Sequence, residues 1–292
     1  MSASLRPLST GQLLDRTFQT YRQNFILFAG ISALPQACLL VMQLGFLAAG
    51  VGGNAKNLGK VGGSAAPMVP AQMGHFALLA FVIAILTIIV SLVASSIATA
   101  ATTFGVSDIY LDKETSISAC FARVKGKIGK VIYASLDLGL RVMIGFMLLI
   151  IPGIYWGGKY GLAVPAVVLE EIKGNQACAR SAVLTKDSVG RIIAIYFLTW
   201  ILVVSISALI WAVLGVAAHG LTRAAGTTAS AVFRQVVSTV VNIIVTPVMS
   251  IALTLAYYDQ RVRKEAFDIE SMMSLLGEPG SAPAENTMGA TS

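Results

Sequence analysis

The sequence is poor in charged residues. Only 12% of its 292 residues are charged, whereas 56% are hydrophobic, and ordinary soluble domains carry about 25% charged residues. A soluble chain of this length would lack the polar side chains needed to cover its surface, so the composition excludes an ordinary water-soluble domain. The mean hydropathy of +0.78 leads to the same expectation, a protein whose outer surface is largely covered by lipid.

Cysteine and histidine are also scarce. The chain has three cysteines, each isolated in the sequence, and two histidines. Without a CxxC pair or a Cys/His cluster, neither a zinc site nor a disulfide framework is predicted, and we expect no cofactor. The net charge of +7 comes from short basic runs between apolar blocks. This pattern favours anionic lipid headgroups rather than nucleic acid as the partner.

Long apolar blocks are abundant. A membrane-spanning helix needs about 20 apolar residues, and several blocks reach or approach that length. The blocks are residues 25–51, 76–106, 131–151, 154–169, 192–218 and 236–258. We therefore predict an all-α polytopic bundle of about six transmembrane helices, with residues 25–258 as the membrane domain.

The third and fourth blocks are separated only by Pro152 and Gly153, a pair typical of a tight reversal. The two blocks could form two short spans, one kinked span or a re-entrant pair. Two short spans are favoured, because a single helix of their combined length would greatly exceed the ~30 Å hydrocarbon core of a bilayer.

Basic residues are distributed unequally among the segments that connect these blocks. With six spans, four segments share one side of the membrane, and together they contain 15 of the 21 Lys and Arg residues. These segments are residues 1–24, 107–130, 170–191 and 259–292. Because cytoplasmic loops are enriched in Lys and Arg, we expect both termini to lie in the cytoplasm.

The segments on that side have the residue spacing of surface helices. In residues 1–24 and just beyond, an apolar residue recurs every three or four positions, at Leu14, Phe18, Tyr21 and Phe25. Ser9 and Gln12 have the spacing of a capping box. Similar patterns around residues 115–131 and, more weakly, 174–191 predict three basic amphipathic helices on the inner surface. Each would precede a pair of spans, which indicates a threefold internal repeat, although any segment that enters a membrane needs basic residues and an apolar face.

Two groups of polar residues lie inside the apolar blocks. Asp137 and Arg141 are four residues apart and share a helix face. The pair could shuttle protons or bind a polar solute, or it could simply neutralise itself near the interface. The second block carries hydroxyl side chains on one face, namely Ser91, Ser95, Thr99 and Thr102. Such a face could line a polar path, but close helix packing is the more common use.

The stretch that ends the sixth block is both aromatic and basic. Tyr257 and Tyr258 are predicted to lie at the level of the lipid headgroups, where amphipathic rings settle. Three basic residues follow on the cytoplasmic side, Arg261, Arg263 and Lys264. We interpret this cluster as a membrane-exit signal rather than a catalytic or nucleic-acid site. Residues 259–292 are therefore assigned to a basic exit segment and a disordered tail.

Four segments of the chain together resemble a bacterial membrane family. They are "LRPLSTGQLLDRTFQTYRQNF", "IPGIYWGGKYGLAVPAVVLEE", "QACARSAVLTKDSVGRI" and "LAYYDQRVRKEAFD". They are similar to the membrane domain of glycerophosphoryl diester phosphodiesterases and to related six-span proteins. The resemblance covers about residues 5–270 and implies a helical fold in a bacterial inner membrane. Some family members also carry a soluble, metal-binding phosphodiesterase barrel, for which these residues show no counterpart, so no catalytic residue is implied.

The sequence thus predicts an integral inner-membrane protein without an evident catalytic site. A structural, partner-binding or lipid-engaging module is favoured. The alternative is a transporter or channel for a small solute that uses Asp137 and Arg141. An enzyme acting on glycerophosphodiesters is disfavoured, because the motifs for metal binding are missing.

Overall fold

The computed structural model describes residues 9–48, 70–170 and 172–277, and their regular structure is helical throughout. The elements are α1 (Thr10–Gln23), α2 (Phe25–Ala48), α4 (Pro70–Tyr110), α5 (Ile117–Lys125), α6 (Ile128–Leu148), α7 (Ile150–Tyr160), α8 (Ala163–Glu170), a 3-10 turn (Gly174–Gln176), α9 (Ala177–Leu184) and α10 (Val189–Gly277). The predicted all-α class is confirmed. The C-terminal tail, expected to be disordered, lies outside the described residues from 278 onward.

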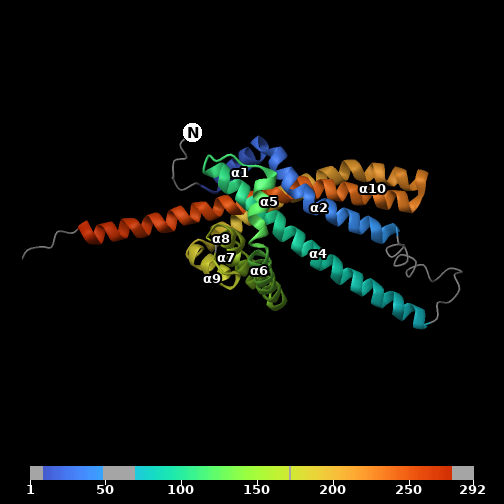
Figure 1. The fold of residues 1–292 in the computed structure, drawn as a ribbon, viewed down its shortest axis with the longest axis horizontal. Coiled ribbons are helices and arrows are strands. Elements are labelled where there is room, and N and C mark those ends of the chain that lie inside the picture. The colour runs from blue at the N-terminus through green and yellow to red at the C-terminus, as the bar shows by residue number, and fades with distance from the viewer. Residues whose placement is uncertain (1–8, 49–69, 171, 278–292) are drawn as a thin grey trace, which may run out of the picture.

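Long apolar helices extend from one end of the molecule (Figure 1). α2 packs against α4 and α10, and α4 also packs against α10. α10 folds back on itself, so that Val237 and Val241 in its second half pack against Val203 and Ile206 in its first half. A hydrogen bond between the side chains of Gln235 in α10 and Gln43 in α2 links these helices. We call the long parts of α2, α4 and α10 the arms.

Several described segments are long and apolar enough to cross a membrane. They are Phe25–Leu47, Phe81–Tyr110, Ile128–Leu148, Val189–Ala217 and Ala229–Lys264. The protein is therefore a polytopic helical membrane bundle. The described residues contain five such segments rather than the six expected, and the difference arises from the fourth apolar block.

The fourth block, residues 154–169, is a broken helix, so it is not among these continuous segments. α7 ends at Tyr160 and α8 begins at Ala163. The eight residues of α8 would extend only ~12 Å, and residues 163–168 are all buried in protein. Hydroxyl groups of α9 replace the helical hydrogen bonds lost at the break: Ser181 Oγ and Thr185 Oγ1 each donate to the Lys159 carbonyl at 2.9 Å. The second of the two expected short spans is therefore not one continuous helix; this block returns along α6 as the two shorter helices α7 and α8.

α6 and α7 form an antiparallel hairpin that leaves the molecule at a large angle to the arms (Figure 1). The chain reverses at Leu149, whose backbone is extended (φ −169°, ψ 156°). The reversal therefore comes shortly before the predicted Pro152–Gly153 pair. A Cβ atom added to Gly145 would lie 2.8 Å from the Gly153 Cα atom, so the close approach of the two helices depends on glycine at this position.

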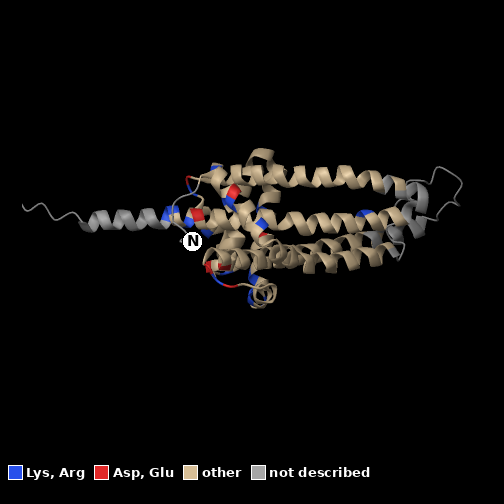
Figure 2. Cartoon of the chain, turned by 90° about the horizontal axis from the view of Figure 1, so that it is seen from above, with Lys and Arg blue, Asp and Glu red and all other residues tan. Residues whose placement is uncertain are grey.

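The shorter helices gather where the arms meet. We call this region the junction; it comprises α1, α5, α8 and α9 with the adjoining ends of α4 and α10. α8 lies between two clusters of buried hydrophobic side chains. Ala163 and Val167 belong to one cluster, and Ala166 belongs to the other. Charged residues of the described chain gather at this end (Figure 2). The start of α1 and the end of α10 both lie on this side of the arms (Figure 1).

The predicted surface helices are present as α1, α5 and α9. The capping box is observed, since the Ser9 amide donates to Gln12 Oε1 at 2.9 Å and the Gln12 amide donates to Ser9 Oγ at 3.2 Å. However, the residues that α1 buries against the protein are Leu13 and Thr17, next to the expected apolar face. Phe18, on the expected face, remains 38% exposed.

Candidate functional site at the junction

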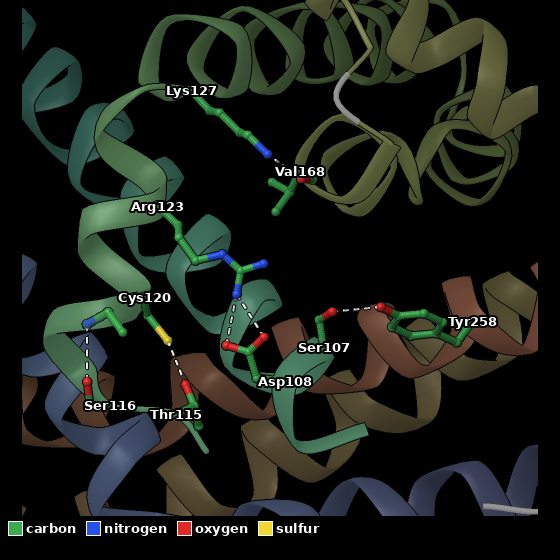
Figure 3. A network of polar contacts seen from close by, with 10 residues as sticks. Ser107, Asp108, Thr115, Ser116, Cys120, Arg123, Lys127, Val168 and Tyr258 are labelled. Atoms are coloured by element: carbon green, nitrogen blue, oxygen red, sulfur yellow. Dashed lines mark hydrogen bonds and ion pairs between the residues drawn. The ribbon is translucent and has the colours of Figure 1, made fainter. Parts of the chain in front are cut away.

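Three carboxylates form the polar framework of the junction, and each is bound by arginine. The first is Asp108, near the end of α4. The guanidinium group of Arg123 in α5 donates to both Asp108 oxygens, at 2.7 and 2.9 Å (Figure 3). The same guanidinium lies over the Phe104 ring, 4.3 Å from its centroid. Hydrogen bonds between charged groups are stronger than neutral ones, so this contact holds α5 against the end of α4.

Lys127 extends this contact toward α8. Its ammonium group donates to the Val168 carbonyl at 3.3 Å (Figure 3) and lies 5.0 Å from the centroid of the Phe104 ring. The carbonyls in the last turn of a helix have no partner within that helix. Lys127 therefore ties the start of α6 to the end of the buried helix α8.

The second carboxylate is Glu170, the last residue of α8. Arg180 Nε in α9 lies 2.9 and 2.7 Å from its two oxygens, and the Tyr257 hydroxyl in α10 donates to Oε1 at 2.7 Å. Burial would raise the pKa of the Glu170 carboxyl, but the bonds from Arg180 and Tyr257 outweigh burial and hold this pKa below its ordinary value. Glu170 is therefore ionised at neutral pH and joins α8, α9 and α10.

The third carboxylate, Asp259 of α10, is the most buried of the three. Its side chain is only 2% exposed and lies 2.7 Å from Arg191 Nη1 and 3.0 Å from Arg263 Nε. Gln260, the next residue, accepts a hydrogen bond from the Ser188 hydroxyl at 2.8 Å. Because Ser188 directly precedes α10 and Arg191 lies in its first turn, these contacts join the start of α10 to its returning half at the junction.

These ion pairs hold helices together, and we call the contacts of Asp108, Glu170 and Asp259 with their arginine partners the clamp. Arginine neutralises each carboxylate, and charge-assisted hydrogen bonds occupy the oxygens that a general base would need to be free. Within the part of the chain that the structure describes, no group of three or more His, Cys, Asp or Glu residues could hold a metal ion. The arrangement can therefore fix helices in place.

The structure places the predicted exit cluster inside this clamp. Tyr257 is fully buried, so it is a core residue rather than a ring facing lipid headgroups. Tyr258 shares a hydrogen bond of 2.8 Å with Ser107 (Figure 3) and stacks on Tyr110 with 4.7 Å between ring centroids.

The basic residues that follow are also engaged in the clamp. Arg263 binds Asp259, and Lys264 binds Asp187 at 3.3 Å. Arg261 is close enough to contribute to lowering the pKa of Glu170. The cluster therefore joins helices to one another in addition to marking the end of a span.

Asp137 and Arg141 lie on the α6–α7 hairpin rather than between the arms. Arg141 Nε and Asp137 Oδ1 are 3.0 Å apart, and the side chains are 44% and 19% exposed. The Arg141 guanidinium lies 5.3 Å from the centroid of the Tyr160 ring in α7. Cys178 of α9 is the other neighbour of Asp137; burial, and then the nearby carboxylate, raise the pKa of its thiol to about 12. The pair thus lies at the base of the hairpin.

The predicted hydroxyl face of α4 is divided between two environments. The Ser91 and Ser95 hydroxyls donate to carbonyls of their own helix, at 2.9 and 3.0 Å, and Ser95 is exposed. Thr102 is buried, with 1% exposure. Thr99 supplies a carbonyl to the Thr103 hydroxyl at 2.8 Å, and that hydroxyl accepts from Thr254 of α10 at 3.4 Å. These contacts favour helix packing over a polar path.

The three framework carboxylates were not predicted from the sequence. Each is an acid at the end of an apolar block, which looks the same in sequence as a solvated helix end. The partners of Asp108 and Glu170 are arginines in the following surface helix, 15 and 10 residues later. An acid that ends a block, followed by an arginine in the next amphipathic segment, is the signal that could have found them.

The fold and the junction define the class of this protein: a polytopic helical membrane protein with a polar clamp at one end of its spans. Comparison with protein-family models, with curated proteins and with solved structures finds no match. The resemblance to the membrane domain of glycerophosphoryl diester phosphodiesterases therefore stays a prediction.

Proposed function

We propose that this protein is a non-catalytic, lipid-engaging module of a bacterial inner membrane, and that the junction holds its surface helices among the headgroups of the cytoplasmic leaflet. The observation that carries the proposal is an exposed apolar edge along α1 and the start of α2. Phe18, Phe25 and Ile26 are 38%, 43% and 82% exposed, although α1 is firmly anchored on its other side. An apolar edge beside basic residues suits the boundary between headgroups and acyl chains.

Two contacts anchor α1. Leu13 is fully buried in the junction core, and the Tyr21 hydroxyl donates to the Ile244 carbonyl of α10 at 2.6 Å. Burial raises the pKa of this tyrosine to about 12, so its hydroxyl keeps its proton.

Basic side chains complete the surface that we assign to lipid. Arg22 and Phe18 border a hollow of about 550 Å³ on α1. A basic residue near an anionic leaflet contributes about 1 kcal/mol. The proposed orientation, with both termini in the cytoplasm, is supported by the concentration of charge at the junction (Figure 2) and by the ends of α1 and α10 lying on that side (Figure 1).

A transporter that uses Asp137 and Arg141 is less well supported. Arg141 is bonded to Asp137 on its own helix, and the pair lies on the hairpin rather than between the arms. A structural or lipid-engaging role is also compatible with the resemblance to a membrane domain, which supplies no catalytic residue.

The proposal can be tested by native mass spectrometry of the full chain extracted in mild detergent. We expect retained phosphatidylglycerol or cardiolipin to be enriched relative to the bulk membrane. The double variant Phe18→Ser/Arg22→Gln should reduce this enrichment about fivefold, since it removes about 1 kcal/mol from a basic contact along with the apolar edge. Arg234→Gln, in the second half of α10, is the control and should retain the enrichment. Equal retention of anionic and zwitterionic lipids, or no effect of the double variant, would refute the proposal.

A further inference from the structure

A hollow of about 660 Å³ lies between the α6–α7 hairpin and α10. Its walls include Val142 and Phe146 of α6, Gly157 of α7, and Phe197 and Trp200 of α10. The polar side-chain atoms among its lining residues are the Trp200 indole N–H and the Tyr196 hydroxyl, and the hydroxyl donates to the Gly161 carbonyl at 3.3 Å. Its size is within the range of about 300–1,000 Å³ that is common for ligand sites.

Glycines create this hollow. A Cβ atom on Gly158 would lie 2.4 Å from Ile193, so glycine there allows the hairpin to contact α10 and close the inner end. A Cβ atom on Gly139 or Gly157 would meet nothing within 4 Å. The space directly in front of these two glycines is therefore open, and both line the hollow, so a larger side chain at either position would extend into it.

The mouth of the hollow is continuous with an exposed apolar surface. Met147 and Ile151, at the tip of the hairpin, are 80% and 77% exposed, and Trp200 on the opposite wall is 54% exposed. In a polytopic membrane protein, hydrocarbon covers surfaces of this kind. The lining carries no charged side chain that would recognise a headgroup or a polar solute, so its chemistry matches an acyl chain.

We infer that this groove binds an acyl chain of one membrane phospholipid. This inference rests on the proposed lipid-engaging function and adds a second contact to it: α1 meets headgroups, whereas the groove holds hydrocarbon. The glycines on the hairpin are then specificity residues, since they determine the depth of the groove.

The test uses the full chain in detergent with Trp200 as the sole tryptophan, after Trp156→Phe and Trp211→Phe. The probe is phosphatidylcholine with dibrominated acyl chains, which quench tryptophan on contact. Quenching should saturate at about one lipid per protein. Gly157→Leu and, independently, Gly139→Leu should weaken binding about tenfold, because the new side chain displaces at least two methylenes of the ligand. Gly45→Leu is the matched control, since a Cβ atom on this α2 glycine also meets nothing within 4 Å.

Several outcomes would overturn the inference. Quenching that rises in proportion to lipid without saturation would show an ordinary lipid annulus. Equal affinity of the Gly157→Leu, Gly139→Leu and Gly45→Leu proteins, at matched thermal stability, would show that the groove is not the site. A dimeric mass with no quenching would show that a second copy covers the groove. Since the probe is zwitterionic, Phe18→Ser/Arg22→Gln should leave quenching unchanged, so failure of the headgroup proposal is distinguished from failure of this one.

Discussion

Apolar side chains are exposed on the surface of the arms but buried in the junction. In the first half of α10, Leu209 is 69% exposed and Val213 is 66% exposed, whereas α8 in the junction buries every residue from Ala163 to Val168. Both sequences are strongly apolar. The difference shows that lipid surrounds the arms, where apolar side chains can face outward, and that the junction is a packed core in which protein surrounds the apolar side chains.

The polar contacts also differ between the two regions: they are neutral between the arms and charged in the junction. The arms are joined by neutral groups such as Gln43 and Gln235. The junction is joined by ion pairs that include Asp259 with Arg191 and Glu170 with Arg180. Ionised groups are costly inside a bilayer, so the gathering of these ion pairs at the junction favours a position of that end of the bundle outside the hydrocarbon.

The largest expected effect comes from removing the most buried charge of the junction. Asp259→Asn leaves Arg191 and Arg263 without their carboxylate, and we expect a loss of about 3–5 kcal/mol in unfolding free energy, measured by denaturant or thermal unfolding in detergent. Asp187→Asn is the control, because Asp187 is 78% exposed where it meets Lys264. Asparagine also tolerates its positive φ of 68°. Similar losses for both variants would contradict the clamp.

Truncation of one leucine in each region compares the two surroundings directly. Leu162 is fully buried beside α8, so Leu162→Ala should destabilise the protein by about 2–5 kcal/mol through lost burial and a cavity. Leu209 is 69% exposed in an arm, so Leu209→Ala should have little effect, since lipid or detergent is as apolar as leucine. If both variants unfold at the same temperature, the contrast between a protein core and a lipid-facing surface is wrong.

The smallest expected effect concerns the pH dependence of the clamp. The folded-state pKa of Glu170 lies below its ordinary value of 4.5, so the associated stability is complete above pH 4.5 and is lost as the pH falls below 4.5 toward the folded pKa. Glu170→Gln should lower stability by about 1.5–3 kcal/mol at neutral pH, as expected for a bond to a charged group. It should also flatten the acid dependence, as seen in unfolding scans from pH 7 to about pH 3. The exposed residue Glu114, changed to Gln, serves as the control, and an unchanged acid slope in Glu170→Gln would contradict the assignment.

The features that the sequence predicted are local ones. The start of α1 follows from Ser9 and Gln12, which bond across three positions, and the long spans follow from the length of their apolar blocks. The fate of residues 154–169 could not be predicted in this way, since burial in lipid and burial in protein select the same apolar side chains. The Tyr257–Glu170 bond joins residues 87 positions apart, and no local pattern encodes such a partner.

The contact between Arg191 and Asp259 has a consequence for the topology of α10. It joins the start of α10 to the returning half of the same helix at the junction. We therefore expect a backbone cut between the two halves to leave the ion pair at the junction and the contacts of Val203 with Val237 and Val241 in place. Side-chain contacts along the two halves of α10 thus specify their pairing in addition to the chain connection.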